Sequence, residues 1–251
     1  MRTRALAVGF TAVLAAAVPV RAQNGDAPLT KGQTAVACAI SPGVLPLDKD
    51  AIRILGSQDT AVRTIFGPRD QLVIQGGASR HLQLGQTWFV RHAGWFGPES
   101  SAQPYAIATA GWLKIVAVND TTAIGVVDYA CGPIMLGDYL EPFAAPAVAA
   151  DMDRPSAGGT LDFEHLGHVL YGDGLSWTAG IGGFMLVDRG ADQGASVGSR
   201  FAVYRDLAQK GVPLASVGEV VVVSTGPSTS VVRVVDARDA VTTGDVVVPR
   251  K

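Results

Sequence analysis

The sequence has little charge and no surplus of basic residues. Of its 251 residues, 20 are Lys or Arg and 22 are Asp or Glu, so the formal net charge is −2. Binding to the phosphate backbone depends on clustered bases, and nucleic acid is therefore not a predicted partner. The chain is 48% apolar, which is too much for a disordered protein and predicts a packed core.

Apolar runs of membrane-spanning length are also missing. Residues 1–22 combine Arg2 and Arg4, an apolar stretch over 5–18 and the cleavage-site pattern Val-Arg-Ala at 20–22, which is typical of a secretory signal peptide. That stretch is shorter than the roughly 20 residues that cross a bilayer, so a retained anchor is the weaker interpretation. We expect no transmembrane segment after cleavage and a periplasmic or secreted mature chain.

Cysteine is scarce, with only Cys38 and Cys131. Two thiols in an exported chain predict a disulfide, and in the chain-entropy model such a long loop contributes on the order of 4 kcal/mol. Two alternatives are weaker. A lipidated Cys38 would need an apolar segment before it, where the sequence is polar, and a catalytic Cys131 would need a nearby His.

The most informative feature is an internal duplication. Residues 111–142 match 218–249 without a gap, and eight of the 32 positions are identical. Upstream, 72–90 match 185–203, and the first copy has six more residues in the loop that follows. We predict module one over 51–143 and module two over 161–251. Residues 23–50 are expected to pack on module one, and the Ala/Pro-rich residues 144–160 form a linker.

Both modules are expected to be all-β. Val-rich runs of strand length are separated by Gly, Pro, Asp and Ser, and near-continuous apolar runs indicate strands covered on both faces. In a unit of this size that pattern predicts a small closed β-barrel, or alternatively a compact sandwich. The helix candidates are short: Asp206–Lys210 and, less clearly, Asp162–Leu166.

A Gly-Asp pair recurs at the same place in both copies, as Gly137-Asp138 and Gly244-Asp245. Glycine can take a positive φ in a tight turn, and the carboxylate can accept backbone N–H groups across it. We interpret these residues as structural turns. Catalytic work would require the two carboxylates to converge within roughly 5 to 10 Å.

The densest group of potential metal ligands is His165 and His168 with Asp162 and Glu164. Gly167 argues against a helix that would align the two imidazoles, and no further ligands follow at a recognisable spacing. We therefore predict no metal site and no cofactor, and we interpret these side chains as solvated turn residues.

Trp95 and Phe96 lie in the longer loop of module one, where there is little core to fill. Exposed aromatic side chains on a loop are candidate contacts for glycan or for a partner protein. The alternative is a loop that packs its aromatic residues on its own barrel.

Module two resembles a known family. Residues 190–205, the Gly-Glu-Val beginning at 218 and the Gly-Asp-Val-Val-Val-Pro of 244–249 are similar to the small β-barrel at the carboxyl end of flagellar assembly protein T, and to the tails of some envelope proteins with LysM domains. Module one shares the likeness loosely. The chain has no recognisable LysM segment or flagellar amino-terminal domain. The resemblance implies a non-catalytic envelope module.

The sequence therefore predicts a non-catalytic binding or structural protein of the cell envelope. Its modules would present loops to cell-wall glycan or to an envelope assembly partner. One alternative is an exported hydrolase that uses carboxylates at the cleft between the modules, with Asp138, Asp162, Glu164 and Asp245 as candidates. Another is a spacer or assembly subunit that binds no small ligand.

Overall fold

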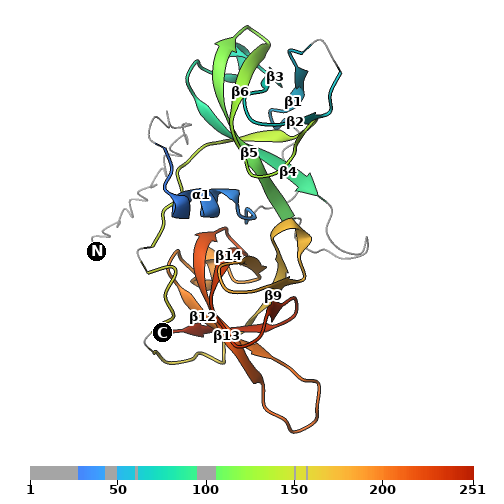
Figure 1. The fold of residues 1–251 in the computed structure, drawn as a ribbon. Helices are drawn as coiled ribbons and strands as arrows, with labels where there is room; N and C mark the ends of the chain where they lie inside the picture. Colours follow the sequence, from blue (N-terminus) through green and yellow to red (C-terminus); the bar gives the residue numbers. More distant parts are fainter. Residues whose placement is uncertain (1–27, 43–49, 60–61, 95–105, 150, 157) are drawn as a thin grey trace, which may run out of the picture.

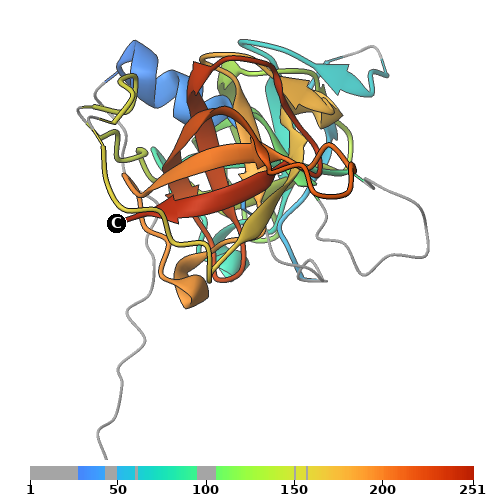
Figure 2. The ribbon, with the colours of Figure 1, turned by 90° about the horizontal axis from the view of Figure 1, so that it is seen from below.

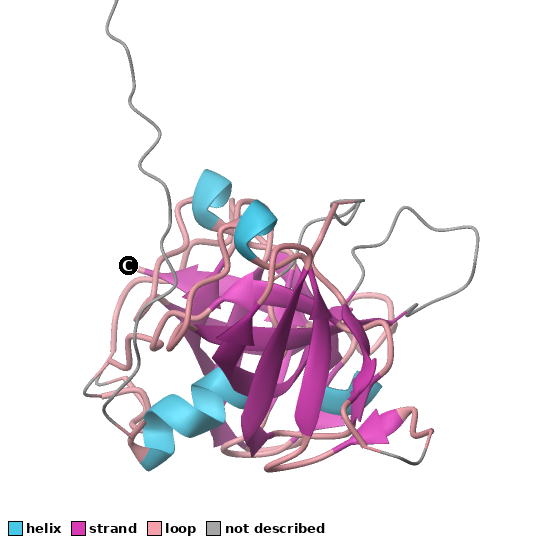
Figure 3. Ribbon diagram, turned by 90° about the horizontal axis from the view of Figure 1, so that it is seen from above, coloured by secondary structure: helices cyan, strands magenta, loops and turns pink. Residues whose placement is uncertain are grey.

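A computed structural model describes residues 28–42, 50–59, 62–94, 106–149, 151–156 and 158–251. Two β-modules are stacked with helix α1 between them (Figure 1), and most of the remaining described chain is strand or loop (Figure 3). The all-β prediction with two modules is confirmed. The predicted signal peptide lies outside the described residues. Within them, no helix has the length and apolar character needed to cross a membrane.

The elements follow one order twice after the helix, with short 3-10 turns labelled η. They are α1 (Lys31–Cys38), then β1 (Ile54–Ser57), β2 (Ile65–Phe66), β3 (Gln71–Gln75), η1 (Ala78–Arg80), β4 (Thr87–Gly94), β5 (Ala106–Val118), β6 (Thr122–Ala130), β7 (Ile134–Met135), β8 (Tyr139–Pro142), β9 (Gly167–Gly172), η2 (Asp173–Leu175), β10 (Thr178–Ala179), β11 (Phe184–Val187), η3 (Ala191–Gln193), β12 (Arg200–Arg205), β13 (Ala215–Thr225), β14 (Ser230–Ala237), β15 (Val241–Thr242) and β16 (Val246–Arg250).

Module two is a closed barrel with the strand order β11-β14-β13-β12-β16-β9, seen from below in Figure 2. Module one has the equivalent order β1-β3-β6-β5-β4-β8. Its two end strands also meet, because the Ile54 N–H donates to the Asp138 carbonyl (2.9 Å) and the Gly137 N–H donates to the Ile54 carbonyl (3.0 Å). Module two has the same pair of bonds. The Val169 N–H donates to the Asp245 carbonyl (2.8 Å), and the Gly244 N–H donates to the Val169 carbonyl (2.8 Å). The predicted small barrel is therefore the correct form.

Irregularities in the strands are duplicated as well as the strands. The β5–β6 ladder shifts register between Trp112 and Leu113, and the β13–β14 ladder shifts between Glu219 and Val220, which are the aligned positions. The β4–β5 and β12–β13 ladders share a shift at Val90 and Val203. Bulges are specific features of a strand pairing, so their coincidence supports descent of both modules from one unit.

Each barrel encloses its own apolar core, which follows the two-residue period of the strands. Val220 and Val222 point into the barrel of module two. Val221 and Val223 point outward and are also buried, because α1 covers them. The Val run in β13 is thus covered on both faces, as the sequence indicated.

The two helix predictions were wrong. Asp206 accepts the N–H of Ala208 (2.8 Å), and Asp162 accepts the N–H of Glu164 (3.1 Å), so each segment starts with an aspartate-centred turn. Such local bonds compete with helix formation. Ala208 also has a φ of +54°, which no right-handed helix contains.

The segments outside the modules are both in contact with module two. Residues of α1 pack on module one, where the sequence placed residues 23–50, and also on module two. The linker is held as well. Arg200 pairs with Asp151 (3.0 Å), Arg233 pairs with Asp153 (2.8 Å), and Met152 is buried with the apolar outer face of module two.

Candidate functional site

Helix α1 forms the junction between the modules. Thr30 caps its first turn by accepting the Gln33 N–H (3.2 Å), and Gln33 accepts the Thr30 N–H in return (3.0 Å). This reciprocal pair is a capping box and stabilises the start of a helix that has only eight residues. The pattern Thr-x-x-Gln was visible in the sequence and marks the helix that our sequence analysis missed.

The helix is buried on two sides. Val36 joins an apolar cluster on the outer face of module two, together with Ala39 and Ile40, which follow the helix. Ala37 packs against Phe89 and Phe143 of module one. Neighbouring small and β-branched side chains that face different directions therefore allow this helix to contact both barrels.

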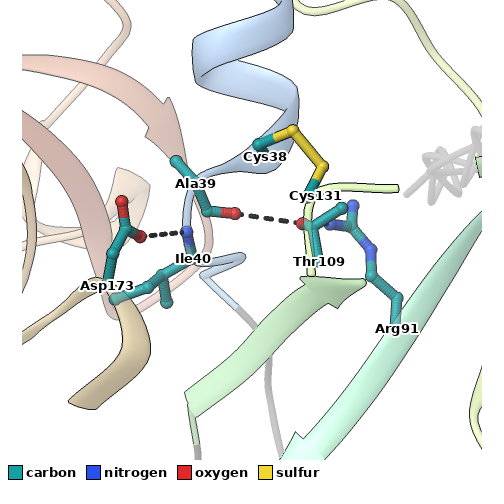
Figure 4. The surroundings of a disulfide bond; sticks show 7 residues. All are labelled: Cys38, Ala39, Ile40, Arg91, Thr109, Cys131 and Asp173. Carbon is teal, nitrogen blue, oxygen red and sulfur yellow. Dashed lines mark hydrogen bonds between the residues drawn. A yellow bond between two sulfur atoms is a disulfide. The ribbon is translucent and has the colours of Figure 1, made fainter. Parts of the chain in front are cut away.

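The backbone just after α1 bonds to both modules in three consecutive residues (Figure 4). Thr109 of module one donates its hydroxyl to the Ala39 carbonyl (3.0 Å), and the Ile40 N–H donates to the Asp173 carboxylate of module two (2.9 Å). The Ser41 N–H then donates to the Ile107 carbonyl of module one (2.8 Å). Desolvation raises the pKa of Asp173, and the bond from Ile40 opposes that rise.

A disulfide fixes the end of the helix to module one, which confirms the predicted pairing. Cys38 is the last residue of α1, and Cys131 directly follows β6. The bond joins residues 93 apart in sequence and is drawn at the centre of Figure 4. The covalent link therefore holds α1 on module one, while apolar packing holds it on module two.

A groove of about 370 Å³ runs along this junction. Arg91 lines it, with its guanidinium 4.2 Å from the centre of the Phe89 ring and its Nε bonded to Glu141 (2.9 Å). Arg91 also donates to Thr109. Among the described lining residues there is no Asp or Glu, so the groove offers no acid and base pair.

The Gly-Asp turn of module one is tied to its own barrel. Gly137 has a φ of +89°, and Asp138 accepts the Met135 N–H (2.7 Å) across the turn. Its other oxygen lies 2.7 Å from Nδ1 of His92. Burial raises the pKa of Asp138, and the contacts with Met135 and His92 oppose the rise.

The turn of module two is built the same way with a different basic side chain. Gly244 also has a φ of +89°, and Asp245 accepts the Thr242 N–H (2.8 Å). Arg205 binds both carboxylate oxygens of Asp245, at 2.7 and 2.9 Å. Arg205 occupies the position aligned with His92. Both aspartates thus bond to a turn N–H and to a β4 or β12 side chain.

The group of potential metal ligands noted in the sequence is only partly brought together. Asp162, Glu164 and His165 lie close enough to share an ion, but Lys251 already binds Asp162 (2.7 Å) and lowers its pKa to about 2. His168 contacts Asp188 instead (3.3 Å). The arrangement is that of side chains at the surface paired with one another, with Asp162 half-buried.

The candidate contact residues Trp95 and Phe96 lie outside the described residues. The junction residues Arg91 and Asp173 were missed, because their partners are 50 and 133 residues away in sequence and no local pattern marks them.

Comparison with known protein families found no matching family model, and comparison with curated proteins found no match.

Proposed function

We propose that this chain is a non-catalytic binding or structural protein of the bacterial cell envelope, located in the periplasm or secreted. Its two modules act as one support that presents loops to cell-wall glycan or to an envelope assembly partner. The signal-like residues 1–22 and the disulfide support an oxidising location. The resemblance of module two to envelope barrels points the same way.

The observation that carries the non-catalytic part is the parallel use of Asp138 and Asp245. Each carboxylate accepts a turn N–H and contacts a basic side chain of its own module. A reacting carboxylate needs a free approach for substrate, and these oxygens already have partners. The hydrolase alternative gains no support, since the described lining of the inter-module groove has no carboxylate.

The first experiment is fractionation of cells that produce the tagged chain, followed by crosslinking in the envelope and identification of the crosslinked partner. We expect the oxidised chain in the envelope or periplasm. A control chain without residues 1–22 should stay in the cytoplasm. Recovery of the unmodified chain from the cytoplasm with both thiols reduced would overturn the proposal.

The predicted contact loop is tested in the same cells. We expect W95A/F96A to lose the crosslinked partner or the binding to isolated cell walls. The matched control is W177A, because Trp177 is 72% exposed and lies in module two. An equal loss in both variants, or in neither, would refute the role of Trp95 and Phe96.

A further inference from the structure

A second pocket, of about 310 Å³, lies on module two beside η3, the start of β12 and the end of β16. Four basic side chains line it, from Arg189, Arg200, Arg250 and Lys251. Asp162 is the one acidic side chain among the described lining residues. The wall is therefore enriched in positive charge, although the chain as a whole is slightly acidic.

All four cations already contact groups of the protein. Arg200 binds Glu219 (2.9 Å) and Asp151 (3.0 Å), with both Nη atoms engaged. Lys251 binds Asp162 (2.7 Å). These two residues hold the linker and the last strand in place.

The other two have a donor left over. Arg189 donates one Nη to the Gln193 carbonyl (3.1 Å), and the two Nη atoms of Arg250 contact the Gly159 carbonyl (3.4 Å) and Glu219 (3.3 Å). The Nε of each is buried and has no acceptor among the described residues. Buried donors of charged groups without a partner are costly, and two in one pocket call for an explanation.

The barrel itself does not require these cations. In module one, the positions aligned with Arg189 and Arg250 hold Gly76 and Phe143, and the same strand order forms there. The position of Lys251 corresponds to Ala144. The basic pocket is thus a property of module two alone and is separate from the fold that both copies share.

We infer that this pocket binds a small organic anion through a carboxylate group, held by Arg189 and Arg250. A planar guanidinium pairs well with a planar carboxylate, and the positive wall of the pocket favours an anion. Ala195, Phe201 and Pro249 supply apolar wall for the organic part of the ligand. The inference concerns the purified protein and does not depend on where the chain acts in the cell.

The test is a titration of the ¹⁵N-labelled full chain, folded with its disulfide, in which the Nε–H signals of Arg189 and Arg250 are followed. The probes are sodium glucuronate, N-acetylglucosamine as a neutral sugar, and inorganic phosphate. We expect glucuronate to shift both signals with a millimolar Kd, and neither N-acetylglucosamine nor phosphate to shift them at the same concentration.

Variants separate a built site from general attraction. R189Q and R189K should each weaken glucuronate binding about tenfold, because lysine keeps the charge and loses the planar fork. The matched control is R238Q, an exposed arginine outside the pocket, which should bind as the wild type does. Melting curves check that every variant is folded.

Three results would overturn the inference. They are shifts with phosphate at lower concentration than with glucuronate, equal weakening in R238Q and R189Q, or wild-type affinity in folded R189K.

Discussion

The same face of the barrel is aromatic in module one and charged in module two. Trp112 and Phe143 form a cluster with Phe89, on which Leu29 and α1 pack. The aligned positions of Trp112 and Phe143 hold Glu219 and Arg250, which pair with each other (3.3 Å). The linker, rather than a helix, covers this charged face. A conserved barrel thus carries two different outer surfaces.

On a second face of the barrel, module two is the buried, apolar copy and module one is the more exposed copy. Val221 and Val223 of module two are buried in a cluster with Val36 of α1, Ile40 and Met152, whereas the aligned Lys114 and Val116 of module one are partly or largely exposed, with Val116 43% exposed. The helix therefore contacts a different face on each of the two barrels. A head-to-tail contact of this kind can be repeated by adding further modules and does not by itself form a closed ring. Polar outer faces on the end units limit such arrays in repeat proteins, and the charged and polar faces here fit that role.

The largest expected effect comes from cutting the link of α1 to module one. Replacing both cysteines, as C38S/C131S, should lower the free energy of unfolding by about 4 kcal/mol, because the unfolded chain regains a long open loop. Urea titration under oxidising conditions measures this loss. The reduced wild type should match the variant, and a loss below about 1 kcal/mol would contradict the account.

Exchanging the two versions of the shared face is the next test. W112E places the carboxylate of module two among the aromatic residues of module one and should lower the free energy of unfolding by about 3 kcal/mol. The loss comes from burial of a charge and from the lost stacking on Tyr129, whose ring centre lies 4.6 Å from that of Trp112. Thermal unfolding gives the comparison. The control W112F keeps an aromatic ring and should cost less than about 1.5 kcal/mol; equal losses would argue against an aromatic junction.

Replacing each turn aspartate by asparagine should have opposite effects on the free energy of unfolding. D245N should lower the free energy of unfolding by about 2 kcal/mol, since the Arg205 fork loses a charged acceptor. D138N should be at least as stable as the wild type at pH 7, because the charged form of a buried Asp with a raised pKa opposes folding.

The pH dependence supplies the check on Asp138. A raised folded-state pKa means that the cost of the charge is present above that pKa and disappears as the pH falls through it. The advantage of D138N should therefore shrink as the pH approaches about 4. An advantage that grows on acidification would show that the sign is wrong.

The smallest effect is expected at the bond from α1 to module two. D173A leaves the buried Ile40 N–H without its acceptor and should cost about 1 to 2 kcal/mol. D173N retains an amide oxygen for this bond and should remain within about 0.5 kcal/mol of the wild type. Chemical unfolding of both variants tests whether this contact is needed.

The fold was predictable where the signal lay in short patterns. The repeated Gly-Asp turns, the Val runs and the aligned strands gave two β-barrels, and two cysteines in a chain with a signal-like start gave the disulfide. The helix predictions that began at Asp162 and Asp206 were wrong because each aspartate forms a local turn, and an aspartate is also a common first residue of a helix.

The junction and the basic pocket were not predictable in this way. Ile40 bonds to Asp173 across the two modules, and Arg189 and Arg250 line one pocket although they are far apart in the sequence of module two. The capping box of Thr30 and Gln33 was the one local signal that was present and overlooked.

We predict that α1 holds the two barrels in one fixed orientation. Residual dipolar couplings of the backbone amides, measured for the oxidised chain in a weakly aligning medium, test this prediction. We predict that a single alignment tensor fits the amides of β3–β6 and of β11–β14 together. Two tensors of different magnitude or orientation would contradict the claim, because they would mean that the barrels move independently.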